Sequence, residues 1–256
     1  MIEPNTQQQK QFKILLVGDN CLDVYKLGQV KRISPEAPVP VFEPQSEITK
    51  PGMAGNVLKN LEALGCEVSF FYTETSTKTR LIDVNSKQHL LRIDQDADCQ
   101  PLKIDFISDS ELDKFDAVVV SDYNKGTIEY SLVEWLRRNF RGPIFVDTKK
   151  DYLDSFEGCY VKINSHEYNS AKTLPGSKWL IVTKGDQGAA YNGALFLPNT
   201  VTIADVCGAG DTFLSALAYQ YLKTNNIERA IDFANRAASV TVQHVGVYAP
   251  KLEEIK

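Results

Sequence analysis

The sequence predicts an α/β fold in which a mostly parallel sheet is covered by helices on both faces. Short apolar runs alternate with amphipathic segments through the second half of the 256-residue chain, as in parallel strands joined by helices. Nearly every apolar run ends in a cluster of polar residues. Since parallel strands present their carboxyl ends at one edge, these clusters predict a polar ligand cleft along that edge.

The first predicted strand covers residues 13–17, an apolar run that ends at Gly18. Asp19, Asn20 and Asp23 follow it and are candidates for holding the hydroxyl groups of a ligand; capping of a loop is the equally weighted alternative. Residues 27–49 differ, because four prolines interrupt their apolar positions. This pattern predicts short edge strands in a small appended β-element.

The remaining elements follow from the periodicity of apolar residues. A helix is predicted after Gly52, since Val57, Leu58, Leu61 and Leu64 share one helical face and Gly65 follows them. A strand over 68–72 comes next, and then an alternating stretch from Arg80 to Ile93. Farther along, the pattern predicts strands at 117–120, 144–146, 160–163 and 180–182 and helices at 132–140 and 227–244.

The run from Ala204 to Phe213 predicts a glycine-rich turn that opens a helix. Gly208 and Gly210 permit a tight turn, and the free amides of a helix start suit an anion such as phosphate. Asp211, in the first turn, could accept a proton from a hydroxyl while these amides stabilise the charge of a moving phosphoryl group. The alternative is an ordinary helix start with Asp211 as its N-cap.

Composition excludes several classes of protein. Hydrophobic residues make up 43% and charged residues 24% of the chain, and the net charge of −5 argues against a nucleic-acid surface. The five cysteines and three histidines form no zinc-type cluster, and no Walker-type loop, Gly-x-Gly-x-x-Gly or Gly-x-Ser-x-Gly occurs. Residues 1–11 are polar and unlike a signal peptide, and no apolar run approaches membrane-spanning length. We therefore expect a cytoplasmic protein with no nucleic-acid or membrane partner.

Four ordered motifs resemble those of the ribokinase-like (PfkB-type) carbohydrate kinases. They are Gly52-x-Ala54-x-Asn56, Asn164-x-x-Glu167, Thr183-Lys184-Gly185-x-x-Gly188 and Asp205-x-x-Gly208-Ala209-Gly210-Asp211. The resemblance spans Lys13 to about Pro250. It implies one domain over 1–256, a three-layer ribokinase-like sandwich with a mostly parallel central sheet, and a small β lid from about 27–49 and 80–94.

A narrower similarity is to the kinase domain of the bacterial D-glycero-β-D-manno-heptose 7-phosphate kinases. It rests on Gly18-Asp19-x-x-Leu22-Asp23-x-Tyr25 and on the proline-rich run from Arg32 to Val41. Those kinases act in ADP-heptose synthesis for lipopolysaccharide. The similarity implies ATP-dependent phosphorylation of the anomeric hydroxyl of that heptose 7-phosphate or a related sugar phosphate. A kinase for another sugar, or a catalytically weak sugar- or nucleotide-binding protein derived from a kinase, is the alternative.

The resemblance also implies roles for individual residues. Asp211 would be the catalytic base, and the amides of Gly208, Ala209 and Gly210 would form the anion hole. The sugar hydroxyls would be held by Asp19, Asp23, Gly52 and Asn56. Lys125 and Lys149 are candidates for the distal phosphate of the substrate, with solvated surface charges as the equally weighted alternative.

The ATP phosphates and ribose would be lined by Thr183, Lys184, Gly185 and Gly188, with Asn235 near the adenine. Asn164 and Glu167 would position Mg²⁺ through water, and Asp205 is a candidate for a monovalent cation such as K⁺. A homodimer through the β lid is expected, as in the family.

The sequence departs from the family pattern at several points. Met53 stands where the family usually has a glycine, which would restrict lid motion, and Cys207 replaces the usual threonine. After Tyr72 only a few polar residues stand where family members normally carry a further helix and strand with a Gly-Asp element. We expect this omission to open one side of the sugar site or to change which sugar fits. The bifunctional relatives carry a nucleotidyltransferase domain in addition, and we expect none here.

Overall fold

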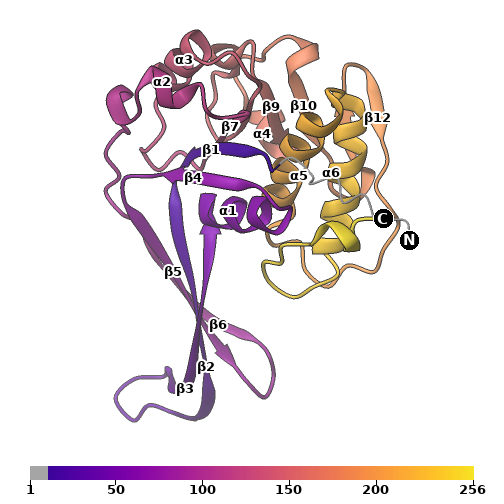
Figure 1. Ribbon diagram of the computed structural model, residues 1–256. Helices are drawn as coiled ribbons and strands as arrows, with labels where there is room; N and C mark the ends of the chain where they lie inside the picture. The colour runs from indigo at the N-terminus through magenta and orange to yellow at the C-terminus, as the bar shows by residue number, and fades with distance from the viewer. Residues whose placement is uncertain (1–10) are drawn as a thin grey trace, which may run out of the picture.

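Two sheets organise residues 11–256, the part of the chain that the computed structural model describes (Figure 1). The expectation for the polar N-terminal residues 1–10 lies outside this part. The larger sheet has the strand order β12-β11-β10-β9-β8-β7-β1-β4. Its strands are β1 (Lys13–Gly18), β4 (Glu67–Phe71), β7 (Ala117–Asp122), β8 (Ile144–Thr148), β9 (Tyr160–Asn164), β10 (Leu180–Thr183), β11 (Ala189–Tyr191) and β12 (Ala194–Phe196). From β4 to β10 the neighbours are parallel, and β11 and β12 are antiparallel.

Helices cover both faces of this sheet, so the predicted three-layer fold is confirmed. Ile14 and Leu16 of β1 belong to one core, with α1 (Ala54–Ala63), α5 (Ala209–Thr224) and α6 (Ile227–Thr241). Leu15 and Val17 belong to the other, with α2 (Asp109–Leu112) and α3 (Tyr130–Asn139). This alternation is the period of two expected for a strand buried on both faces. The remaining helical segments are α4 (Ser165–Ser170), η1 (Ile104–Phe106), η2 (Leu153–Phe156), η3 (Ser177–Trp179), η4 (Gly185–Gln187) and η5 (Leu252–Glu254).

The smaller sheet projects from this body (Figure 1), and we call it the lid after the predicted role, which stays a prediction. Its strands, in the order β3-β2-β5-β6, are β2 (Asn20–Ile33), β3 (Pro40–Met53), β5 (Thr75–Asp83) and β6 (His89–Gln95). The prediction of short strands within 27–49 was wrong, because β2 and β3 are 14 residues each. β3 is an edge strand, where a proline costs no ladder hydrogen bond, and Pro44 lies at a register shift opposite Gly28.

Three of the connections between lid and body are very short. Asp19 alone separates β1 from β2, α1 follows β3 directly, and residues 72–74 join β4 to β5. Met53, at the junction of β3 and α1, has φ of 50° and ψ of −130°, a conformation that side chains rarely adopt. The position that is usually glycine in the family therefore keeps a glycine-like backbone here.

Most predicted elements are present, including α1 and its glycine end at Gly65. The helix α2 and the antiparallel strands β11 and β12 were not predicted. Of the five free cysteines, all but Cys207 are buried. Ile33, Val39 and Leu91 of the lid region are more than half exposed; a homodimer through the lid stays a prediction. Within residues 11–256, no helix has the length and apolar character to cross a membrane.

Candidate active site

Polar residues from the carboxyl ends of three neighbouring strands meet at a cavity of about 130 Å³. Tyr123 follows β7, Asp147 and Lys149 lie at the end of β8, and Asn164 ends β9. The start of α5 closes the cavity with Gly208, Gly210 and Asp211. The structure thus brings together side chains that are up to 88 positions apart in the sequence.

Asp211 lies in the first turn of α5 and is 6% exposed. The N-cap of α5 is Gly208, with φ of 79°, so the alternative of an N-capping Asp211 is wrong. A Cβ atom on Gly208 would lie 2.8 Å from Asn56 Nδ2, and only glycine fits there. The Asp211 carboxylate accepts a hydrogen bond from Asn56 Nδ2 (2.8 Å) and another from the Tyr123 hydroxyl (2.8 Å).

The environment of Asp211 raises its pKa from 3.8 to about 6. Burial is the largest cause, and the nearby carboxylate of Asp147 adds to it, while the hydrogen bonds from Asn56 and Tyr123 and the charge of Lys162 oppose it. Burial and the charge of Asp211 raise the pKa of Tyr123 well above 10, so its phenol remains a donor. Asp211 is therefore ionised at pH 7. Its pKa lies close enough to this pH for the carboxylate to accept a proton.

Any catalysis that uses Asp211 as a base is expected to slow as the pH drops through about 6, because protonation removes the basic form of Asp211. Replacing Tyr123 with Phe removes a donor that favours the ionised form, so the acidic limb of the pH profile should move to higher pH by about one unit. The measurement is kcat/KM from pH 4.5 to 8 for both proteins. Tyr221→Phe is the control. It removes a phenol near the C-terminal end of α5 that is hydrogen-bonded to Tyr160. An acidic limb unchanged by Tyr123→Phe would contradict the tuning by this phenol.

A buried cation, the ammonium group of Lys162, lies beside the start of α5. The Lys162 ammonium is 2.7 Å from Asp147 Oδ2, and a Cβ on Gly210 would lie 2.9 Å from the same ammonium. Lys162 is 4% exposed. Burial opposes its charge, but Asp147 and Glu167 outweigh burial and raise the pKa of Lys162. Among the described residues, the amides of Gly208 and Gly210 have no backbone hydrogen-bond partner. The helix start thus combines free amides with a buried cation, which suits an anion.

A larger cavity of about 510 Å³ shares Gly210 with the smaller one. Four of the residues predicted to line the nucleotide site are in its wall, Thr183, Gly185, Gly188 and Asn235, whereas Lys184 is exposed and outside it. Gly188 has φ of 86°, and a Cβ there would clash with the Phe196 carbonyl, which also accepts a hydrogen bond from Asn235. Apolar side chains not predicted for the site complete the wall: Val201, Ile203, Val206 and Phe213.

Asn164 and Glu167 cap each other at the start of α4. Glu167 also pairs with Lys149 at 2.9 Å. Burial disfavours the charged form of Glu167, but the Asn164 amide and Lys149 outweigh it and lower the pKa. Residues 11–256 hold no group of three or more His, Cys, Asp or Glu arranged to bind a metal directly. Paired oxygen donors of this kind fit a hydrated Mg²⁺ held through water better than one coordinated by side chains.

The predicted sugar-binding residues fall into different environments. Asp19 is 1% exposed and accepts hydrogen bonds from the amides of Tyr123, Lys125 and Thr127, as the loop-capping alternative expects. Asn56 contacts Asp211, as described above. Asp23 pairs with Arg80 at 2.6 Å, and a Cβ on Gly52 would lie 2.5 Å from its carboxylate. The Lys125 ammonium pairs with Asp96 at 2.6 Å.

Asp205 joins two loops near the site. Its carboxylate accepts hydrogen bonds from the amides of Cys207 (3.0 Å) and Gly246 (2.9 Å). Both oxygens already have donors, and a monovalent cation there stays a prediction.

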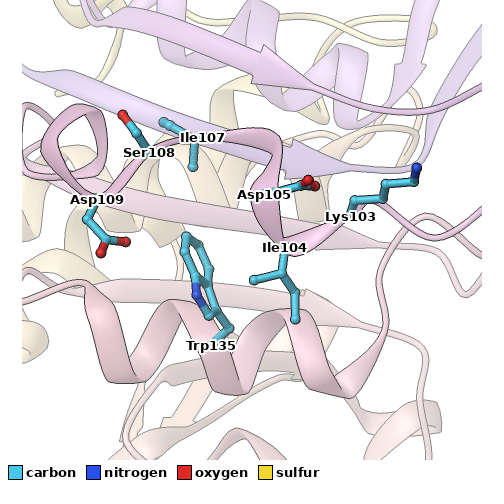
Figure 2. Close-up of a pocket in the computed structure, with 7 residues that line it drawn as sticks. All are labelled: Lys103, Ile104, Asp105, Ile107, Ser108, Asp109 and Trp135. Carbon is cyan, nitrogen blue, oxygen red and sulfur yellow. The ribbon is translucent and has the colours of Figure 1, made fainter.

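Another hollow, of about 630 Å³, lies between residues 103–109 and α3 (Figure 2). Figure 2 shows Trp135 rising from α3 toward the segment that carries Ile104 and Ile107. None of the predicted site residues lines this hollow. It shares no lining residue with either of the two cavities described above.

Tyr123 and Lys162 were missed as site residues from the sequence. The sequence does contain an indication for Lys162, because a lysine inside the apolar run 160–163 needs a buried partner for its charge. Tyr123 follows a predicted strand and lies in Ser121-Asp122-Tyr123-x-Lys125-Gly126, a segment similar to the heptose 7-phosphate kinases, but neither feature singled out its hydroxyl.

Comparison with known proteins gives consistent matches. Residues 53–255 match the family described as "pfkB family carbohydrate kinase". The bifunctional protein HldE of a Nitratiruptor species is 32% identical over 95% of this chain and 64% of its own length. HldE of Helicobacter pylori is also 32% identical, over 95% of this chain and 65% of its own length. The chain therefore spans less than two thirds of these relatives.

The alignment to the Nitratiruptor protein covers 296 positions, more than the 256 residues of this chain, so the relative contains residues with no counterpart here. Among solved structures, a ribokinase from Thermotoga maritima has a TM-score of 0.71 at 18% identity, covering 95% of this chain and 98% of its own. A ribokinase from Arabidopsis thaliana, complexed with ribose and ATP, has a TM-score of 0.66 at 15% identity, covering 96% and 98%. At such identities these structures show the fold alone.

Proposed function

The chain belongs to the pfkB family of carbohydrate kinases, and we propose that it transfers the γ-phosphoryl group of ATP to the anomeric hydroxyl of a sugar phosphate. D-glycero-D-manno-heptose 7-phosphate, or a close relative, is the proposed substrate. One observation carries the proposal: the Asp211 carboxylate lines the smaller cavity next to Gly210, which lines both cavities, and beside the free amides of Gly208 and Gly210. A base next to an anion-binding helix start is what phosphoryl transfer to a hydroxyl requires.

The larger cavity supports ATP binding with the phosphates toward Gly210, which both cavities share. The apolar wall of Val201, Ile203 and Val206 suits an adenine, and Asn235 stands in the same wall. At the other end, the amides of α5 and the Lys162 ammonium face the charge that spreads over the transferred phosphoryl group.

Asp211 accepts the proton of the sugar hydroxyl as that oxygen attacks phosphorus. Asn56 and Tyr123 hold the carboxylate in position, one at each oxygen. Asn164 and Glu167 are the residues proposed to hold Mg²⁺ through water. When bound, the ion would neutralise negative charge on the ATP phosphates.

Incubation with ATP, Mg²⁺ and a sugar panel tests the proposal, with ³¹P NMR to detect a new anomeric phosphate. The panel contains D-glycero-D-manno-heptose 7-phosphate, the same heptose without phosphate, ribose and fructose 6-phosphate. The expected result is turnover that is fastest with the heptose 7-phosphate and is abolished by EDTA. Faster turnover of another sugar would reject the heptose assignment and keep the kinase.

The alternative, a catalytically weak binding protein, is motivated by the segment missing after Tyr72 and by Met53 at the lid junction. Calorimetry separates it from the kinase. Binding of ATP and sugar without any turnover would reject the kinase proposal.

A further inference from the structure

One face of the lid carries more positive charge than its own carboxylates neutralise. Lys50 of β3 and Lys78 of β5 are both paired in register with Asp23 of β2, which lies between them. Side chains of directly paired residues share a face of the sheet. Arg80 lies two positions beyond Lys78, on the same face, and its guanidinium pairs with Asp23 at 2.6 Å. Asp94 of β6 is paired in register with Lys78 on its other side, so this face holds two carboxylates, Asp23 and Asp94.

On the same face, the charges of Arg92 and Asp94 neutralise each other. Arg92 of β6, opposite Arg80, donates two hydrogen bonds of 2.6 Å to Asp94. Lys78, by contrast, has no hydrogen bond or ion pair within the described residues, and Lys50 makes only a long contact of 3.4 Å to the Val247 carbonyl. Because Arg80 is matched by Asp23, the two lysines remain as an excess of two positive charges.

This charged face is turned toward the active site. A Cβ on Gly246 would lie 3.5 Å from the Lys50 ammonium, and the neighbouring Val247 side chain lies 3.2 Å from the Cβ position of Gly208. Gly208 is the N-cap of the helix that carries Asp211. Only Gly246 and Val247 thus lie between the Lys50 ammonium and the start of the helix that carries the base.

The excess is particular to this face. Lys26 of β2 points to the opposite face and pairs with Glu47 at 3.7 Å. The lysines that sequence analysis suggested for a distal phosphate are also already paired, Lys125 with Asp96 and Lys149 with Glu167. Lys50 and Lys78 are half-buried, and neither forms an ion pair among the described residues.

We propose that Lys50 and Lys78, supported by Arg80, bind a phosphate monoester at the end of the acceptor sugar remote from the hydroxyl that is phosphorylated. This proposal rests on the sugar kinase function proposed above. A phosphate monoester carries about 1.5 to 2 negative charges at pH 7, which matches the excess of two. Ammonium groups form strong charge-assisted hydrogen bonds to phosphate oxygens. The lid thereby selects a phosphorylated over an unphosphorylated sugar.

The test compares Lys50→Ala, Lys78→Ala and the double variant with the wild type, using the heptose 7-phosphate and the same heptose without phosphate. Each single change should lower kcat/KM for the phosphorylated sugar by about tenfold, and both together by about a hundredfold, mainly through KM. The value for the unphosphorylated heptose should stay within about twofold. Lys26→Ala, on the opposite face of the lid, is the matched control and should change neither value.

Equal losses with both sugars, or no loss with either, would overturn the proposal. If the wild type phosphorylates no sugar, the kinase proposal has failed, and calorimetry with the heptose 7-phosphate then decides the anion site by itself. Binding that is present in the wild type and lost in the double variant supports the site. Binding that is equal in the two proteins, or absent from both, rejects it.

Discussion

Replacing Asp211 with Asn is expected to lower kcat by about 10²- to 10⁴-fold, the range for loss of a general base. An amide cannot accept the hydroxyl proton, although it occupies the same space beside Asn56 and Tyr123. The KM values for ATP and sugar should change less than tenfold, since the helix amides and the nucleotide cavity remain. Initial rates with ATP and the best sugar of the panel provide the measurement.

Stability provides the control for this variant. The folded-state pKa of Asp211, about 6, lies above its ordinary value of 3.8, so keeping the carboxylate ionised costs stability at pH 7. That cost disappears as the pH falls through 6 toward 4. Asp211→Asn removes it, and the free energy of unfolding at pH 7 should therefore not fall. A variant with the catalytic rate of the wild type would show that Asp211 is not the base.

Replacing Lys162 with Met is expected to lower the free energy of unfolding by about 3–5 kcal/mol, the cost of leaving one charge of a buried pair without its partner. Asp147, whose side chain is 15% exposed in the wall of the smaller cavity, would lose the ammonium at 2.7 Å. Activity should fall as well, because the cation next to Gly210 would be gone. Urea unfolding at pH 7 measures the change in stability.

Two further variants separate charge from volume in this test. The double variant Lys162→Met with Asp147→Asn should recover much of the stability, since no unpaired charge is left. Lys149→Met breaks the ion pair with Glu167. Because the Lys149 side chain is 45% exposed, this change should lower the free energy of unfolding by less than about 1 kcal/mol. A loss for Lys162→Met no larger than that for Lys149→Met would contradict the buried-pair argument.

The periodicity of apolar residues was enough to predict most of the fold. The strand at 13–17 and the helices at 132–140 and 227–244 lie within one to three residues of their observed ends, because each buries a regular stripe. β11 and β12 were missed since three residues are too few to show a period. The prolines of β3 suggested interruption, whereas an edge strand tolerates them.

The site was predictable where local backbone geometry dictated the residue type. Gly208 needs a left-handed φ, and Gly188 has no room for a side chain, so both positions require glycine and are visible in the sequence. Pairings across strands were not accessible in this way. Lys162 meets Asp147 because β8 and β9 are in that register, and Asp19 is occupied by amides of a loop 104 to 108 residues away.

The short connections of the lid determine how the acceptor site is entered. A sheet joined to the body through Asp19, through the junction at Met53 and through residues 72–74 has few backbone torsions that can absorb a rotation. We therefore expect any closure to be a small rocking of four strands as one unit, not the swing of a long loop. Under the proposed function, we expect little conformational entropy to be lost when a sugar is enclosed, because the lid is already ordered as a sheet.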